Sequence, residues 1–240
     1  MGPSPENLKV NINERDSVSA LLYLAPKRDR KGTTLILGHG AGANQLHPFM
    51  QLFAKGLAAR GLDVLTFNFV YMEQGRRVPD PKAKLETCYL AVIGASARHS
   101  QLKGNQIAIG GKSMGGRIAS QVAAAMETET GPAGFANASI AALVFLGYPL
   151  HPPGNPEKLR DAHLVNLKTP MLFVQGSRDA FGTTEEIRSL IKRLKLPATL
   201  EAIEGADHSL KVPKSSGLTQ AQVYDSIMER IVSWLDLRLG

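Results

Sequence analysis

The sequence has little cysteine, few aromatic side chains and no long apolar run. Its single cysteine, Cys88, excludes an internal disulfide framework and a thiolate zinc site, because each needs several cysteines. The longest apolar stretch, around residues 140–146, is far shorter than the roughly 18 residues that a membrane-spanning helix needs. Aromatic residues make up 6% of the chain, which argues against a stacking platform for single-stranded nucleic acid. The first ten residues have neither a basic flank nor an apolar core, so we expect a cytoplasmic protein without membrane contact.

What the chain does have is the composition of a soluble globular protein, with 43% hydrophobic and 20% charged residues. Its 28 lysines and arginines exceed the 21 acidic residues, giving a formal net charge of +7. We interpret the basic clusters at 27–31 and 192–195 as solubilising charge and expect no nucleic-acid partner, because charge alone is a weak footprint. The length of 240 residues, without repeats or long linkers, predicts one domain over residues 1–240. The sequence does not give the oligomeric state.

Short β-rich runs alternate with segments of helical periodicity. Most of these runs are nearly continuous in apolar residues, which is typical of strands covered on both faces. They span residues 18–25, 33–39, 63–70, 106–111, 139–148, 170–176 and 198–203. The alternation predicts an α/β fold, in which a mostly parallel sheet carries helices on both faces. The short link between 8–13 and 18–25 predicts an antiparallel hairpin at one edge of that sheet.

A serine on a predicted strand–turn–helix junction is the first candidate for chemistry, because ligands of such sheets bind beyond the carboxyl ends of the strands. The strand at 106–111 leads into Gly111-Lys-Ser-Met-Gly115, the pattern G-x-S-x-G. Its glycines permit a sharp turn that lifts the Ser113 hydroxyl above the sheet, with a helix N-terminus behind it to favour developing negative charge. A glycine-rich turn with a capping serine is the simpler alternative. A P-loop is rejected, because its first glycine would fall on Gln106.

A second loop, His-Gly-Ala-Gly at 39–42, follows the strand at 33–39. Acyl transfer needs backbone donors that hold the oxyanion, and we predict the amides of Ala41 and Met114 for this role. We expect His39 to anchor the loop rather than to carry a proton. The same letters also spell the dinucleotide fingerprint G-x-G-x-x-A, which requires an acidic residue at the end of the next strand. That strand ends around Asn68 instead, so nicotinamide binding stays the less favoured alternative.

An acid and a histidine follow two later strands in the order that a serine nucleophile needs. Asp179 comes just after the strand at 170–176, and His208 just after the strand at 198–203. A serine hydroxyl is a weak nucleophile, so a histidine must take its proton and an acid must orient that histidine. We therefore predict a triad of Ser113, His208 and Asp179. Asp207 is the alternative acid, but as the immediate neighbour of His208 it is poorly placed to reach the imidazole.

With these loops identified, the chain resembles the alpha/beta-hydrolase superfamily over nearly its whole length. It is most similar to the compact group of serine hydrolases that are like dienelactone hydrolase and like testis-expressed proteins. The segments that carry the closer resemblance are HGAGAN at 39–44, FNFVYMEQGRR at 67–77, GGKSMGGRIAS at 110–120, LGYPLHPPGNPEKLR at 146–160, QGSRD at 175–179 and GADHSL at 205–210. One departure is that dienelactone hydrolases use a cysteine nucleophile where this chain has Ser113, which makes dienelactone a doubtful substrate.

The resemblance implies an esterase that forms an acyl-enzyme on Ser113 and needs no metal or organic cofactor. Only about twenty residues, four of them proline, separate the strands at 139–148 and 170–176, so we expect no lid domain and a small soluble ester or thioester as substrate. Four side chains are predicted to line the mouth of the site, namely Tyr71, Met72, His151 and Phe181. Lys112 and Arg117 either favour an anionic acyl group or are solvated charges, the commoner arrangement. A non-catalytic scaffold that binds a protein partner remains the alternative to an enzyme.

Overall fold

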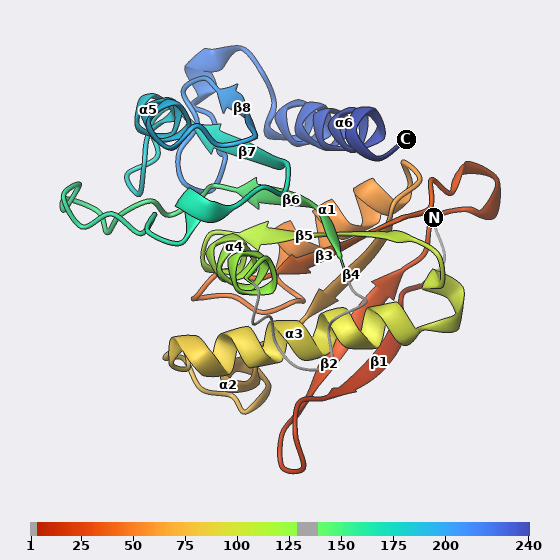
Figure 1. Ribbon diagram of the computed structural model, residues 1–240. Coiled ribbons are helices and arrows are strands. Elements are labelled where there is room, and N and C mark those ends of the chain that lie inside the picture. Colours follow the sequence, from red (N-terminus) through yellow and green to blue (C-terminus); the bar gives the residue numbers. More distant parts are fainter. Residues whose placement is uncertain (1–3, 129–138) are drawn as a thin grey trace.

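The computed structural model describes residues 4–128 and 139–240 of the chain (Figure 1). Residues 1–3 and 129–138 lie outside this description. Eight strands form one sheet in the order β1-β2-β4-β3-β5-β6-β7-β8. The strands are β1 (Glu6–Asn11), β2 (Ser17–Tyr23), β3 (Thr33–Gly38), β4 (Asp63–Phe67), β5 (Gln106–Lys112), β6 (Ile140–Leu146), β7 (Met171–Gly176) and β8 (Ala198–Ile203).

The pairing of these strands confirms the predicted sheet. β1 pairs with β2 and β2 with β4 in antiparallel fashion, whereas the pairs β4–β3, β3–β5, β5–β6, β6–β7 and β7–β8 are parallel. The antiparallel hairpin at the edge is therefore as expected. Because the six parallel strands all end on one side, the loops after β3, β5, β7 and β8 meet along a common edge.

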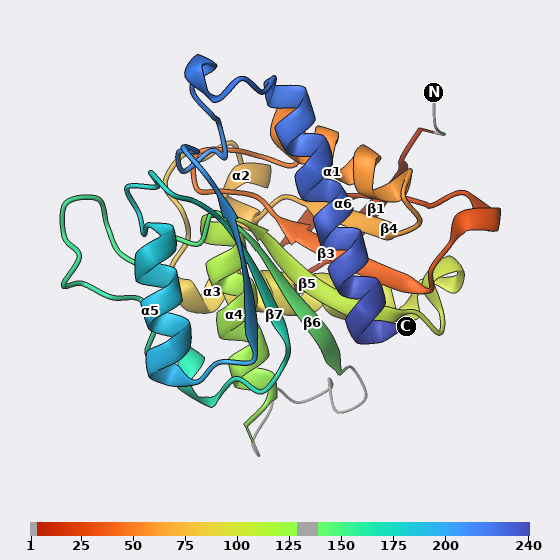
Figure 2. The same ribbon diagram turned by 90° about the horizontal axis from the view of Figure 1, so that it is seen from above.

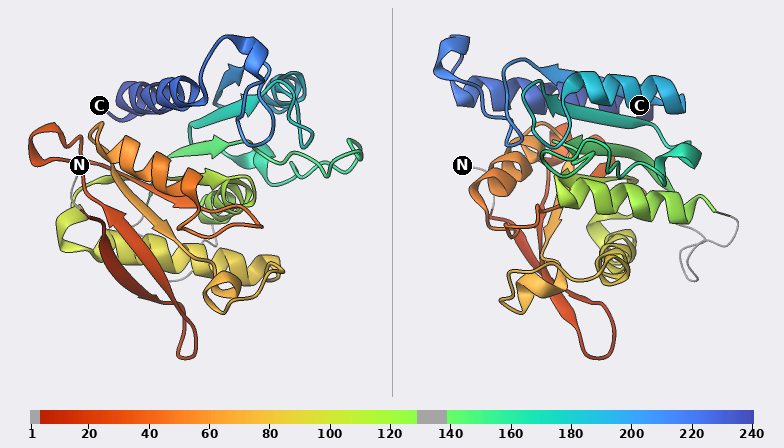
Figure 3. Two further views of the ribbon diagram at one scale, coloured as in Figure 1. Left: turned by 180° about the vertical axis from the view of Figure 1, so that it is seen from behind. Right: turned by 90° about the vertical axis from the view of Figure 1, so that its left-hand side faces the viewer.

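Helices cover both faces of the sheet, as predicted. The helices are α1 (Pro48–Ala58), α2 (Val70–Glu73), α3 (Lys82–Arg98), α4 (Met114–Met126), α5 (Thr184–Leu194) and α6 (Gln220–Leu239), with short 3-10 turns at Lys27–Asp29, Ser100–Leu102, Leu164–Asn166 and Lys214–Ser216. One apolar core joins α3, α4 and α5 to the sheet, and a second joins α1 and α6 to its other face. In Figure 1, α6 lies above β6 and α3 lies below β5, and Figures 2 and 3 show the same arrangement from other sides.

Local sequence explains where several helices begin. Thr183 and Glu186 form a capping box at the start of α5, and Thr219 and Gln222 form another at the start of α6. At the start of α3, Asp80 is not the N-cap residue. Pro81 occupies the N-cap position, and Oδ1 of Asp80 instead accepts a hydrogen bond from Arg76 at 2.6 Å.

Two connections matter for the site. The strand predicted over 63–70 ends at Phe67, because the backbone leaves the sheet to donate from the Phe69 amide to the ring of His39. The segment between β6 and β7 contains only one short 3-10 turn, so no lid domain covers the carboxyl edge, as expected. Among the described residues, no helix is both long and apolar enough to cross a lipid bilayer.

Candidate active site

Ser113 lies on the tight turn between β5 and α4, in a backbone conformation that L residues rarely adopt. Its φ is 52° and its ψ is −116°. This positive φ stores strain, which the surrounding packing must hold in place. A Cβ on Gly115 would lie 2.1 Å from the carbonyl oxygen of Gly38, and a Cβ on Gly111 would lie 2.2 Å from the same atom. Both glycines are therefore required by the close approach of the turn to the end of β3.

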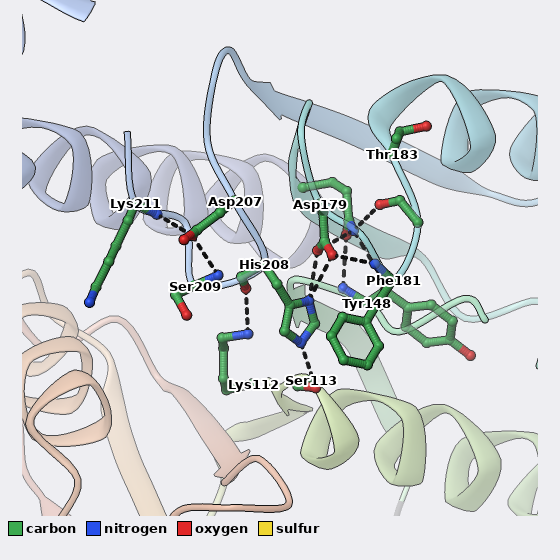
Figure 4. A network of polar contacts seen from close by, with 12 residues as sticks. Lys112, Ser113, Tyr148, Asp179, Phe181, Thr183, Asp207, His208, Ser209 and Lys211 are labelled. Carbon is green, nitrogen blue, oxygen red and sulfur yellow. Dashed lines mark hydrogen bonds and ion pairs between the residues drawn. The ribbon is translucent and has the colours of Figure 1, made fainter. Parts of the chain in front are cut away.

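His208 joins the serine to an acid. Its Nε2 lies 2.8 Å from Oγ of Ser113, and its Nδ1 lies 2.9 and 2.8 Å from the two carboxylate oxygens of Asp179. Figure 4 shows the three side chains in one row, each from a different strand-exit loop. In the neutral tautomer with its proton on Nδ1, the imidazole donates to Asp179 and presents Nε2 as the acceptor for the serine hydroxyl. The structure thus brings the three predicted triad residues together.

The carboxylate of Asp179 is buried, with 1% of the residue exposed, and is fixed by two further donors. The side-chain amide of Gln175 donates to its Oδ2 at 2.8 Å, and the backbone amide of Phe181 donates to its Oδ1 at 2.8 Å. Such donors hold the charged carboxylate in one orientation toward the imidazole. The ring of Phe181 also lies against that imidazole, with the two ring centres 4.2 Å apart.

Asp207, the alternative acid, has a different task. Its Oδ1 accepts hydrogen bonds from the backbone amides of Ser209 and Lys211, at 2.8 and 2.9 Å. In Figure 4 its side chain points away from the imidazole toward these amides. Asp207 therefore shapes the loop that carries His208, and Asp179 is the carboxylate that contacts the ring.

Lys112 holds the same histidine loop from the other side. Its Nζ donates to the backbone carbonyl of His208 at 2.6 Å (Figure 4). Burial lowers the pKa of the Lys112 ammonium to about 8, while the charges of Asp179 and Asp207 partly oppose this effect. The residue before the nucleophile thus contacts the backbone of the predicted base.

The loop after β3 faces the serine. A Cβ placed on Gly40 would lie 3.7 Å from Cβ of Ser113. The carbonyl of Gly40 accepts hydrogen bonds from Nδ1 of His39 at 2.8 Å and from the amide of Ala43 at 3.1 Å. The carbonyl of Gly40 and the amide of Ala41 belong to the same trans peptide unit, in which C=O and N–H point in opposite directions. The two hydrogen bonds to the carbonyl therefore also fix the direction of the Ala41 amide.

His39 therefore anchors the loop. The residue is fully buried, and its Nε2 accepts a hydrogen bond from the amide of Phe69 at 3.1 Å. Burial lowers the pKa of His39 to about 4, so the ring is neutral at pH 7. A dinucleotide fingerprint requires a helix that begins at its glycines, but α1 begins only at Pro48. The geometry of this loop does not fit the nicotinamide alternative.

A cleft of about 690 Å³ opens at this edge of the sheet. Ser113, His208, Ala41 and Met114 all line it. Its lining includes residues of α3 and α4, and also Phe49 and Met50 of α1 and Tyr224 of α6.

Of the four side chains predicted to line the mouth, Phe181 does so, and the other three need correction. Tyr71, Met72 and His151 are not among the described residues that line the cleft. Tyr71 is fully buried and donates from its hydroxyl to the carbonyl of Ala41 at 2.9 Å, which holds the loop rather than a ligand. Met72 packs against the core on the α3 side, and the buried ring of His151 lies 3.1 Å from Glu186.

The predicted site residues do not include Gln175, and no structural contact was expected of Tyr71 or Lys112. Gln175 offered a signal, because it is the one polar residue of the apolar strand β7 and stands two residues before the loop that carries Asp179. The contacts of Tyr71 and Lys112 have no comparable signal, because their partners are backbone carbonyls of distant loops.

Comparison with known proteins identifies the family of the chain. Residues 31–236 match the family model described as an alpha/beta hydrolase domain. The chain therefore belongs to this family, and the predicted superfamily is confirmed.

Several solved structures share the fold over the full length. An alpha-beta serine hydrolase homologue from Coxiella burnetii is 18% identical, with a TM-score of 0.72 and coverage of 98% of this chain and 99% of the other. A lidless serine hydrolase from Xanthomonas campestris is 15% identical, with a TM-score of 0.72 and coverage of 98% and 96%. A dienelactone hydrolase from Anabaena variabilis is 16% identical, with a TM-score of 0.72 and coverage of 99% and 100%.

Proposed function

We propose that the protein is a serine esterase that hydrolyses small soluble carboxylic esters or thioesters through an acyl-enzyme. The observation that carries the proposal is the continuous chain of contacts from Ser113 to His208 to Asp179, with each step at 2.8–2.9 Å. A catalytic role for Ser113 also explains its strained backbone, because backbone strain of this kind is retained at functional sites.

In the proposed reaction, Oγ of Ser113 attacks the ester carbonyl while Nε2 of His208 takes its proton. Asp179 keeps the imidazole in the required tautomer and stabilises the imidazolium that forms. The amides of Ala41 and Met114 donate to the oxyanion, and one such donor contributes about 3 kcal/mol in comparable sites. His208 then protonates the leaving alcohol or thiol, and a water molecule activated by the same histidine hydrolyses the acyl-enzyme. No residue in this sequence of steps requires a metal or an organic cofactor.

The size and cover of the cleft favour a small substrate. The loop between β6 and β7 does not form a lid, and the cleft of about 690 Å³ is open along the sheet edge. Long-chain lipid esters need a deep apolar cover, which an open cleft does not provide. Structural relatives described as serine hydrolases and as esterases support the same reaction class.

A fluorophosphonate probe tests this proposal, because it labels only an activated serine. We expect it to label the wild type and the Ser209→Ala variant, and not Ser113→Ala. Ser209 is the matched control, since it is a second serine that lines the same cleft. Hydrolysis of 4-nitrophenyl acetate should follow the same pattern. A folded wild type that is neither labelled nor active would refute the esterase and favour the non-catalytic scaffold, which co-purification of a protein partner would then support.

A further inference from the structure

The cleft around Ser113 is strongly cationic. Five lysine and arginine side chains line it, against one carboxylate. The cations are Lys82, Lys112, Arg117, Arg160 and Lys211, and the carboxylate is Asp80. Oδ1 of Asp80 already accepts a hydrogen bond from Arg76, at 2.6 Å, so little negative charge remains to balance the cleft.

Two of the five cations are both half-buried and without a partner. Lys112 donates to a carbonyl, Lys82 lies 3.5 Å from Glu86, and Lys211 is exposed to solvent. Arg117 and Arg160 are half-buried, and neither guanidinium has an ion pair or hydrogen bond with any residue of 4–128 or 139–240. Nε of Arg117 is fully buried and lacks any acceptor among these residues. A buried guanidinium donor without an acceptor is costly, which points to an acceptor supplied from outside the chain.

The two arginines lie close to each other and to the nucleophile. Arg117 follows Ser113 by one helical turn, and its amide donates to the carbonyl of Ser113 at 3.1 Å. Arg117 is the fourth residue of α4, and Ser113 is the N-cap of the same helix. Arg160 reaches the same end of the cleft from the loop between β6 and β7. After burial, the positive charge of Arg160 is the largest cause that lowers the pKa of Arg117.

A buried polar cluster fixes the backbone of both arginines. The hydroxyl of Ser120 donates to the carbonyl of Arg117 at 2.8 Å, and the hydroxyl of Tyr148 donates to the carbonyl of Arg160 at 3.3 Å. Nε2 of His163 lies 2.8 Å from the first hydroxyl and 3.4 Å from the second. Burial lowers the pKa of His163 to about 4, so this link is neutral at pH 7. Helix α4 and the β6–β7 loop are thus tied together where each carries its arginine.

We propose that Arg117 and Arg160 form a subsite for a carboxylate of the substrate, so that the enzyme prefers esters that carry a free carboxylate at the far end of the acyl chain. This inference rests on the proposed esterase function and names its substrate class. A guanidinium presents two parallel donors that match the two oxygens of a carboxylate. The half-ester of a short dicarboxylic acid has both groups, a carbonyl for Ser113 and a carboxylate for the two arginines that line the same cleft.

A matched pair of esters tests the subsite. Mono-4-nitrophenyl adipate carries the free carboxylate, and methyl 4-nitrophenyl adipate is the same chain with that charge removed. For the wild type we expect kcat/KM to be about tenfold or more higher for the anionic ester, as for hydrogen bonds to a charged group. The preference should shrink as sodium chloride screens the charges.

Substitution of the arginines should remove that preference. In Arg117→Gln and in Arg160→Gln, KM for the anionic ester should rise, and the ratio of kcat/KM between the two esters should fall toward one. Arg98→Gln is the control, because it removes the same charge from the exposed last turn of α3 and should keep the wild-type ratio. If Arg117→Gln does not fold, the subsite is tested by Arg160→Gln and by the salt dependence of the wild type. Arg160 lies in a loop, so its substitution should disturb folding less.

The outcomes separate the subsite from the proposed function. Hydrolysis of both esters at equal kcat/KM by the wild type would overturn the subsite and leave the esterase standing. If neither ester is hydrolysed, the esterase falls, and calorimetric titration with the adipate dianion decides the subsite alone. Binding by the wild type that weakens about tenfold or more in Arg160→Gln would support it. Absence of binding by the wild type would overturn it.

Discussion

Replacing Gly115 by alanine tests the geometry on which the nucleophile depends. Gly115 is the second residue of α4, and a Cβ there would lie 2.1 Å from the carbonyl oxygen and 2.3 Å from the carbonyl carbon of Gly38. The shortest contacts that real Cβ atoms make are about 3.0 Å, so the end of β3 would have to retreat by about 0.9 Å. Gly38 pairs with Phe67 on one side and Gly111 on the other, so this retreat strains the ladder on both sides.

The sign of the effect follows from two competing terms. Alanine favours a helix over glycine by at most about 1 kcal/mol. Overpacking a close contact costs about 1–3 kcal/mol, and each buried backbone hydrogen bond that is lost costs about 1–3 kcal/mol more. The net loss should therefore be about 3 kcal/mol. For a chain of this size, that loss lowers the melting temperature by about 6–12 °C.

Activity should fall further than stability alone explains, because β3 leads directly into the loop that carries Ala41. A shift of about 1 Å in a catalytic group can reduce the rate about 100-fold. We would measure melting by circular dichroism and the hydrolysis of 4-nitrophenyl acetate at a temperature where the variant is folded. Gly42→Ala is the control for stability, since a Cβ at Gly42 meets nothing within 4 Å and its φ is not left-handed.

One result would refute this reasoning. If Gly115→Ala melts within about 2 °C of the wild type and keeps its activity, the contact between α4 and Gly38 is not as close as described. The strained turn would then need another explanation.

Three further predictions concern charge and protonation. Asp179→Asn should lower kcat for 4-nitrophenyl acetate by about 10⁴-fold, because the amide no longer selects the required tautomer of the imidazole; a loss below tenfold would transfer the role of acid to Asp207. His39 has a pKa of about 4 in the folded protein against 6.5 ordinarily, so the unfolded chain binds the extra proton between these values and stability falls with falling pH in this window. Between pH 7 and 4.5, the free energy of unfolding measured with urea should decrease by about 2–3 kcal/mol less in His39→Gln than in the wild type; an equal decrease in the two proteins would contradict the buried neutral ring. Lys112 has a pKa of about 8 against 10.5, so the folded protein releases its proton first and stability rises with pH between these values. Between pH 7.5 and 9.5, the free energy of unfolding should increase by about 2 kcal/mol less in Lys112→Met than in the wild type. An equal increase in the two proteins would assign the titration to another group.

The fold was predictable because its signals are local. Continuous apolar runs specify buried parallel strands, and the capping box at Thr183 specifies the start of α5. The end of β4 was not predictable, since the apolar letters continue through Val70. What ends the strand is a hydrogen bond from Phe69 to a histidine thirty residues earlier, and such a partner is visible only in three dimensions.

The positions of the candidate triad residues followed from strand order, but the cleft lining did not. Ser113, Asp179 and His208 each come directly after a strand, so the parallel topology alone brings them to one edge. Tyr71 and Met72 also follow a strand, yet the short helix α2 turns them into the core. The direction of a side chain in a loop depends on backbone dihedrals that residue types do not specify there, so lining residues are harder to predict than strand-exit positions.

The buried side-chain amide of Gln175 connects the candidate triad with the loop that carries Arg160. Its Nε2 donates to Asp179, and its Oε1 accepts from the amide of Tyr148 at 2.8 Å. Tyr148 in turn donates through its hydroxyl to the carbonyl of Arg160. The carboxylate that orients His208 and the loop that carries an arginine of the proposed subsite are therefore held by one network, all of whose hydrogen bonds are made inside the protein. Because buried polar networks are rigid when every member is satisfied, the backbone that carries Arg160 is held in a fixed position relative to the candidate triad. In the proposed subsite, that fixed backbone would make chain length, and not charge alone, a property that separates one half-ester from the next.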